Sequence, residues 1–86
     1  MRREIEFFGE IELDLVYMAR RLRDALKLED LLTAAGIEYL VETGTYTGGL
    51  LIKRDLAGAF FYVPPVDAER TRELLLQNRY KPYEGD

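Results

Sequence analysis

The chain has 86 residues, 48% of them apolar and 33% charged, enough for one hydrophobic core but too few for two. Its formal net charge of −4 lacks the excess of Lys and Arg that a general nucleic-acid binder carries. The lack of Cys and His excludes disulfides, zinc sites of the Cys/His type, thiolate nucleophiles and imidazole bases. We therefore expect one domain over residues 1–86 that is not an enzyme and holds no metal or cofactor, although chemistry by Tyr and carboxylate groups stays open.

The sequence contains no pattern typical of secretion or of membrane insertion. Glu4 and Glu6 interrupt the start of the chain, where a secretory signal needs a continuous apolar stretch. The longest uncharged run, Leu56–Val66, is broken by Pro64 and Pro65 and is shorter than the roughly 20 residues of a membrane-spanning helix. We expect a cytoplasmic protein without membrane or nucleic-acid partners.

The first regular element expected is a strand over residues 10–17, because apolar and acidic residues alternate there with the period of a half-buried strand. One side of that strand would carry Ile11, Leu13, Leu15 and Tyr17, and the other Glu10, Glu12 and Asp14. A single helix over residues 8–35 would also fit the apolar spacing, but it would expose Val16 and Tyr17, and Gly9 offers a natural break. Residues 1–8 could form a strand, a helix or a flexible arm, so residues 1–9 are either an added strand or an N-terminal extension.

A helix is predicted next, over residues 21–35, since its apolar residues recur at three- and four-residue steps. That stripe consists of Leu22, Ala25, Leu28, Leu31, Leu32 and Ala35. Gly36 stands where a helix usually ends in a left-handed residue. The β-branched, aromatic and apolar run Ile37–Glu42 is then typical of a strand.

Three glycines within residues 43–49 predict a loop, followed by a short strand over 50–53 and a turn over 54–58. The run Ala59–Val63 predicts a strand that Pro64 and Pro65 end. Asp67 is expected to cap the next helix, whose inward stripe is Thr71, Leu74, Leu75 and Asn78. Residues 79–83 are expected to close the domain as a short strand, which Pro82 restricts to a sheet edge.

This order of elements predicts an α+β fold, a ferredoxin-like sandwich of βαββαβ type with both helices on one face of an antiparallel sheet. Phe60, Phe61, Tyr62 and Val63 are consecutive, so their side chains point to both faces, yet the helices cover only one. The first eight residues or a second copy of the chain must cover the other face. We therefore predict a homodimer or higher oligomer, with those four residues as candidate interface residues.

The glycine-rich stretch is the candidate ligand site, because flexible backbone, hydroxyls and a nearby cation can surround an anion. Its candidate residues are Thr45, Tyr46, Thr47, Gly48, Gly49 and Arg54. Leu50 stands where a phosphate-binding loop needs Lys, so a plain connecting loop is the simpler interpretation.

Three further groups of residues invite a functional interpretation. Gly58–Val63 contains aromatic residues, as an RNA-recognition motif does, but its residues do not stand at the positions that the motif requires. Core packing is its simpler role. The acidic residues Glu4, Glu6, Glu10, Glu12 and Asp14 could suggest a metal site or a general acid, but the last three line up along one strand face, which favours a solvated face. The cluster of Arg20, Arg21 and Arg23 could bind an acidic partner or a phosphate, while surface ion pairing is its simpler role.

Ala35-Gly36-Ile37, Phe61-Tyr62-Val63 and Asp67-Ala68-Glu69-Arg70 give the chain a resemblance to a small prokaryotic family described as putative signal-transducing proteins, with a GlnB-like, ferredoxin-like fold. The resemblance spans about residues 15–76 and implies a bacterial regulatory role without implying any site residue. Two hypotheses follow. The first is a non-enzymatic regulatory or protein-interaction module acting as an oligomer, and the second is a sensor for a nucleotide or amino acid that binds at residues 43–54 or between subunits.

Overall fold

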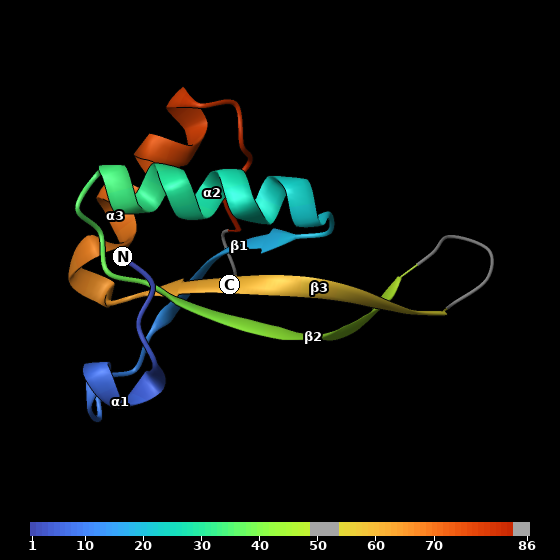
Figure 1. The fold of residues 1–86 in the computed structure, drawn as a ribbon, viewed down its shortest axis with the longest axis horizontal. Coiled ribbons are helices and arrows are strands. Elements are labelled where there is room, and N and C mark those ends of the chain that lie inside the picture. The colour runs from blue at the N-terminus through green and yellow to red at the C-terminus, as the bar shows by residue number, and fades with distance from the viewer. Residues whose placement is uncertain (49–53, 84–86) are drawn as a thin grey trace.

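A three-stranded antiparallel sheet organises the protein, whose computed structural model describes residues 1–48 and 54–83. Strands β1 (Asp14–Ala19), β2 (Leu40–Gly48) and β3 (Arg54–Val63) lie in the order β1-β3-β2. Helices α2 (Leu22–Ala34) and α3 (Pro65–Gln77) cover one face of the sheet, and the short helix α1 (Ile5–Phe8) lies on the opposite side (Figure 1). The expectation of a small α+β fold with two helices on one sheet face is thus confirmed.

Strand β1 begins at Asp14 rather than at Glu10, and its buried side differs from the predicted one. The register with β3 shifts between Leu15 and Tyr17, so that Leu15 pairs with Tyr62 whereas Tyr17 pairs with Phe61. This irregularity has the geometry of a β-bulge and breaks the period of two on which the prediction depended. As a result Leu15 and Tyr17 fall on different faces, and Val16 and Ala19 are the buried residues of the strand.

Helix α2 matches the predicted helix to within one residue at each end. Ala25, Leu28 and Leu32 form its buried stripe as expected, but Leu22 in the first turn is 76% exposed. At the other end Gly36 has a φ of +74°, and the Ile37 N–H donates to the Leu32 carbonyl at 3.0 Å. This bond and the one from Gly36 N–H to the Thr33 carbonyl make a Schellman motif, so the predicted left-handed glycine is confirmed.

The hairpin of β2 and β3 is longer than predicted. The loop expected over residues 43–49 is wrong, because β2 continues to Gly48, and the turn expected over residues 54–58 is wrong, because β3 begins at Arg54. The short strand expected over residues 50–53 lies outside the described residues. The threonines and Tyr46 between the glycines favour extended backbone, and the long ladder with β3 outweighs the preference of glycine for turns.

Helix α3 begins two residues before the predicted cap. Pro65 is its first residue, a position at which the N–H that proline lacks would have no partner within the helix. Pro64 precedes it as the N-cap. Asp67 therefore lies inside the first turn, where its carboxylate accepts a hydrogen bond from Arg70 Nε at 3.0 Å. Of the predicted inward stripe, Thr71 and Leu75 are fully buried, whereas Asn78 is exposed.

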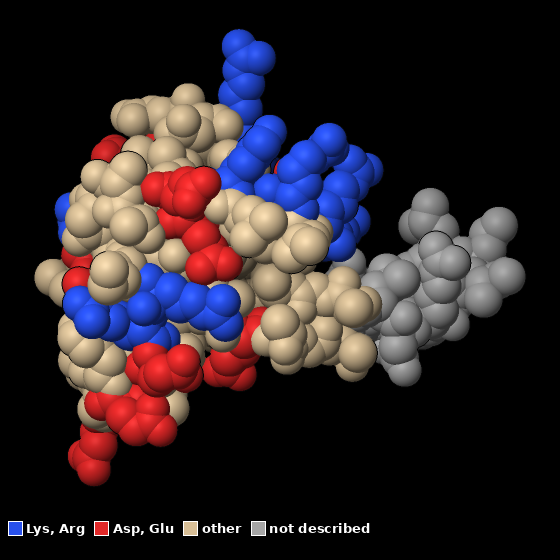
Figure 2. Space-filling view, viewed as in Figure 1, with Lys and Arg blue, Asp and Glu red and all other residues tan. Residues whose placement is uncertain are grey.

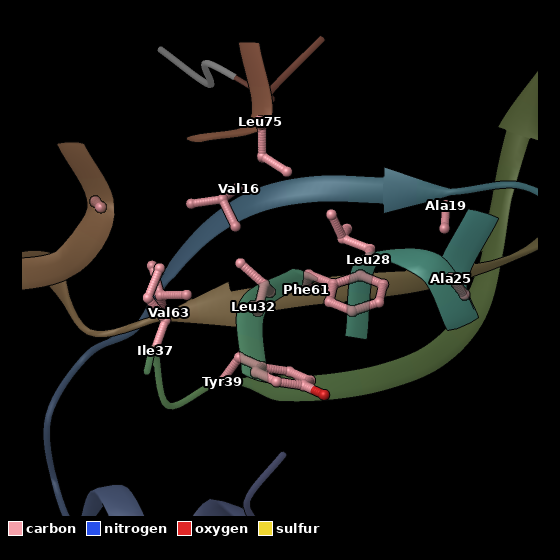
Figure 3. Close-up of a cluster of buried hydrophobic side chains, with 11 residues drawn as sticks. Val16, Ala19, Ala25, Leu28, Leu32, Ile37, Tyr39, Phe61, Val63 and Leu75 are labelled. Carbon is pink, nitrogen blue, oxygen red and sulfur yellow. The ribbon is translucent and has the colours of Figure 1, made fainter. Parts of the chain in front are cut away.

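The core lies between the sheet and the two helices (Figure 3). Phe61 and Val63 from β3 meet Leu28 and Leu32 from α2, and the Tyr39 ring packs beside Phe61 with 5.9 Å between centroids. The one buried polar side chain among the described residues belongs to Thr71, whose hydroxyl donates to the Asp67 carbonyl at 2.7 Å. Hydrogen-bonding capacity and apolar packing are therefore both satisfied in the core.

Both ends of the described chain contact the sheet without adding a full strand. Arg2 forms an isolated parallel bridge with Tyr39, after which the segment turns into α1. The strand expected over residues 79–83 is not assigned in the described part of the chain. Instead the Tyr83 N–H donates to the Val16 carbonyl at 2.7 Å, while the buried Pro82 has no N–H with which to extend a ladder.

Candidate functional site

The sheet face opposite α2 and α3, which we call the open face, carries large apolar side chains. The register pairs Leu15 with Tyr62 and Met18 with Phe60, so these four half-buried residues share that face. The segment of residues 1–13 lies against one end of it, where Ile5 and Ile11 line a pocket of about 210 Å³ together with sheet residues. Both isoleucines remain at least half exposed, so the segment covers part of the open face and adds apolar surface of its own.

Ionic and backbone contacts hold this N-terminal segment in place. The Arg3 guanidinium donates to the Glu38 carboxylate from Nε at 2.7 Å and from Nη2 at 3.3 Å. Those hydrogen bonds are the largest cause of a lowered pKa of Glu38. Backbone bonds from Arg3 N–H to the Tyr39 carbonyl and from Tyr39 N–H to the Met1 carbonyl form the bridge, and Arg2 pairs with Glu29 of α2 at 3.7 Å. The segment is thus bound both to the residues directly before β2 and to α2.

The far part of the hairpin, which we call the β-arm, consists of residues 44–48 and 54–58. Thr45 pairs with Ala57 and Gly48 with Arg54, whereas the ladder between β1 and β3 reaches only as far as Ala59. Within the described residues the β-arm is therefore two strands wide, and Figure 1 shows it projecting beyond the N-terminal end of α2. From Thr43 to Gly48 the edge strand β2 carries no charge and no proline, the devices by which exposed edges usually avoid pairing.

The predicted ligand residues lie in the β-arm. Thr45, Tyr46, Thr47 and Gly48 are residues of β2 paired with β3, and Arg54 is the residue of β3 opposite Gly48, so five of the six are strand residues and form no loop around an anion. Gly49 lies outside the described residues.

The predicted interface residues divide between the two faces of the sheet. Phe61 and Val63 are fully buried beneath the helices. Phe60 and Tyr62 lie on the open face and are half-buried, so of the four only these two present side chains to a partner there.

A surface pocket of about 410 Å³ lies where β1 passes into α2. Its wall includes two residues of the predicted arginine cluster together with residues from both strand β1 and the C-terminal segment: Tyr17, Arg20, Arg21, Asp24, Lys81 and Tyr83. Figure 2 shows Lys and Arg side chains gathered at the end of the molecule where α2 begins. The sequence pointed to the arginines, but nothing in it placed Lys81 and Tyr83 beside them.

The acidic residues near the N-terminus do not converge. Glu10 and Glu12 precede β1 and are exposed, while Asp14 is half-buried at the start of the strand. In residues 1–48 and 54–83 no group of three Asp or Glu side chains is placed to hold a metal ion.

Three tyrosines, Tyr17, Tyr39 and Tyr62, have raised pKa values. Burial is the largest cause at Tyr17, Tyr39 and Tyr62, with Asp24, Glu29 and Glu42 respectively adding to it. At Tyr39 a hydrogen bond with Thr33 opposes the shift. A raised pKa keeps these phenols protonated at neutral pH, the opposite of what a tyrosine base needs.

None of the helices that the structure describes is long and apolar enough to cross a membrane. Comparison with protein-family models, with curated proteins and with solved structures finds no match for this chain. The function is therefore argued from the β-arm, the open face and the pocket.

Proposed function

We propose that this chain is a non-enzymatic regulatory or protein-interaction module of the cytoplasm that works as a homo-oligomer, most simply a homodimer. We also propose a ferredoxin-like fold of βαββαβ type, as in the putative signal-transducing family that the sequence resembles. In support, β1, α2 and β2 form a crossover with β3 between the two strands, and the Tyr83 N–H reaches the outer edge of β1, where such a fold has its fourth strand.

The observation that carries the oligomer proposal is the projecting β-arm. A two-stranded ribbon is at best marginally stable in water, and it needs a third strand or a packed helix for independent stability. Thr45 and Gly48 have β3 on one side, and the outer edge of β2 at these residues has no partner among the described residues. A second copy that pairs along this edge would supply the missing strand.

The open face supports the same proposal. Phe60 and Tyr62 are half-buried there, and Ile5 and Ile11, which line a pocket together with Tyr62, are each at least 50% exposed. Contiguous apolar surface of this kind marks interaction sites on small proteins. A partner that pairs with the edge of β2 would lie next to this surface and could cover both.

The test is the mass of the protein in solution, measured by sedimentation equilibrium over a wide range of concentration. We expect the mass of two chains. The Thr45→Lys variant should dissociate at a protein concentration about tenfold higher, which corresponds to a loss of about 1.4 kcal/mol in the free energy of dimerisation. Gln77→Lys adds the same charge at an exposed position of α3 and should leave the dimer unchanged. The mass of one chain at the highest concentration, or equal effects of both variants, would overturn the proposal.

The sensor alternative is less well supported at residues 43–54. Thr45, Tyr46, Thr47 and Gly48 are extended residues in a ladder with β3, so the N–H groups that this edge strand leaves free do not converge as those of an anion-binding loop do. A thermal-shift screen of nucleotides and amino acids tests that alternative: stabilisation that Thr47→Ala abolishes would favour it.

A further inference from the structure

The pocket at the start of α2 combines cationic side chains from two distant parts of the chain. Arg20 and Arg21 come from the connection between β1 and α2, and Lys81 comes from the C-terminal segment. The hydrogen bond from Tyr83 N–H to the Val16 carbonyl holds that segment against β1. The three cations are therefore brought together by the fold, on a chain whose net charge is −4.

Two of the cations on the pocket wall, Arg21 and Lys81, take part in none of the ion pairs of the described residues. Within the described part of the chain, Asp24 is the one carboxylate on the pocket wall. Cations gathered at the start of a helix also oppose its dipole, since α2 begins at Leu22 with no side chain capping its N–H groups. A bound anion would relieve both the mutual repulsion of the cations and their conflict with the dipole.

The size and the aromatic walls of the pocket narrow the class of anion. A volume of about 410 Å³ lies within the range of small-molecule sites and exceeds what an inorganic ion needs. Tyr17 and Tyr83 offer ring surface for an organic group, and the Asp24 carboxylate can accept a hydrogen bond from a ligand hydroxyl or amine. Arginine and lysine side chains are the usual partners of phosphate.

We propose that this pocket binds a small organic phosphate of about the size of a nucleoside monophosphate, with its phosphate on Arg21 and Lys81 and its organic part beside Tyr83. The pocket contains no residue of the β-arm, and of the described residues on its wall Met18 alone also belongs to the open face. Ligand binding therefore does not depend on the proposed dimer, and each proposal can fail without the other.

Titration calorimetry with adenosine monophosphate, adenosine and inorganic phosphate tests the proposal on the whole chain. We expect saturable binding of the monophosphate and at least about tenfold weaker binding of the other two, because each lacks one half of the contacts. The double variant Arg21→Gln/Lys81→Gln should weaken monophosphate binding by about tenfold or more. The matched double variant Arg23→Gln/Arg79→Gln removes the same charge from exposed residues that do not line the pocket, and it should bind within about twofold of the original chain.

Three results would overturn the proposal. One is the absence of saturable monophosphate binding at millimolar concentration. Another is equal weakening by the two double variants, since that would show a response to net charge alone. The third is inorganic phosphate binding as tightly as the monophosphate, which would show that the organic part of the ligand contributes nothing to binding. Circular dichroism of each variant confirms that the substitutions leave the fold intact.

Discussion

The ring of Phe60 on β3 packs over Gly44 on β2, so closely that a Cβ on Gly44 would lie 3.3 Å from Phe60 Cε2. Glycine in the middle of a strand usually weakens it, because it has no side chain to pack and loses much backbone entropy. Here the aromatic ring of the neighbouring strand occupies the space above the glycine. The pair therefore explains why a glycine stands where the sequence pattern indicated a loop.

We expect the effect of Gly44→Ala to depend on residue 60. Alanine loses less backbone entropy on folding than glycine does, but in the original chain its Cβ would lie close to the Phe60 ring. The two effects oppose each other, so the free energy of unfolding should change by less than about 0.5 kcal/mol. In a Phe60→Ala background the contact is absent, and Gly44→Ala should stabilise by about 0.5–1 kcal/mol. Urea unfolding of the four chains measures both steps, and additive effects would contradict the close contact.

Gly36 provides a second, purely conformational test. Its φ of +74° is unfavourable for residues with a Cβ, yet nothing lies within 4 Å of the position that a Cβ would take. We expect Gly36→Ala to lower the free energy of unfolding by about 1–2 kcal/mol, and Gly36→Asn to lower it by less, because asparagine tolerates the left-handed region better. Thermal or urea unfolding checks this order, and an alanine variant as stable as the original chain would contradict it.

The contact between Arg3 and Glu38 should make stability depend on pH. Because the folded pKa of Glu38 is lowered from its ordinary value of 4.5, this carboxylate stabilises the fold above that value and loses its contribution as pH falls through the folded pKa. We expect Arg3→Gln to be less stable than the original chain at pH 7, and the difference to shrink steadily below pH 4.5. Urea unfolding at several pH values measures it.

Arg23→Gln is the control for that experiment, because Arg23 is exposed and takes part in none of the ion pairs of the described residues. Its stability relative to the original chain should not vary with pH between 3 and 7 beyond about 0.3 kcal/mol. A difference between the Arg3 variant and the original chain that persists undiminished at pH 3 would show that packing of the arginine, and not its charge, is responsible.

The sequence predicted the elements whose local signals agree with their tertiary surroundings. Helix α2 ends at Ala34, just before Gly36, because its apolar period and its left-handed terminator point to the same boundary. Ala59–Val63 lies in a strand because it is apolar enough to be buried on one face and half-buried on the other. The β-arm was missed because three glycines outweighed the threonines in a local reading, while strand pairing is decided by the partner strand. The bulge at β1 was missed for the same reason, since one extra residue exchanges the two faces without changing the composition.

The candidate pocket was only half predictable. Arg20 and Arg21 are adjacent in sequence and were visible as a cluster, whereas Lys81 joins them because its segment contacts β1 through the hydrogen bond from Tyr83 to Val16 and the ring contact between Tyr80 and Tyr17. Long-range contacts of this kind leave no periodic pattern in the sequence. Pro82, which restricted this segment to a sheet edge, was the one local indication that it returns to β1.

The attachment of residues 1–13 has a consequence for how the molecule responds to salt. Arg3 and Glu38 are about one third exposed, and Arg2 is about half exposed opposite Glu29, so dissolved ions reach and screen both pairs. Releasing the segment uncovers Tyr62 and Leu40 but leaves the packing between sheet and helices intact. The amount of apolar surface that the protein presents to its surroundings is thereby linked to ionic strength.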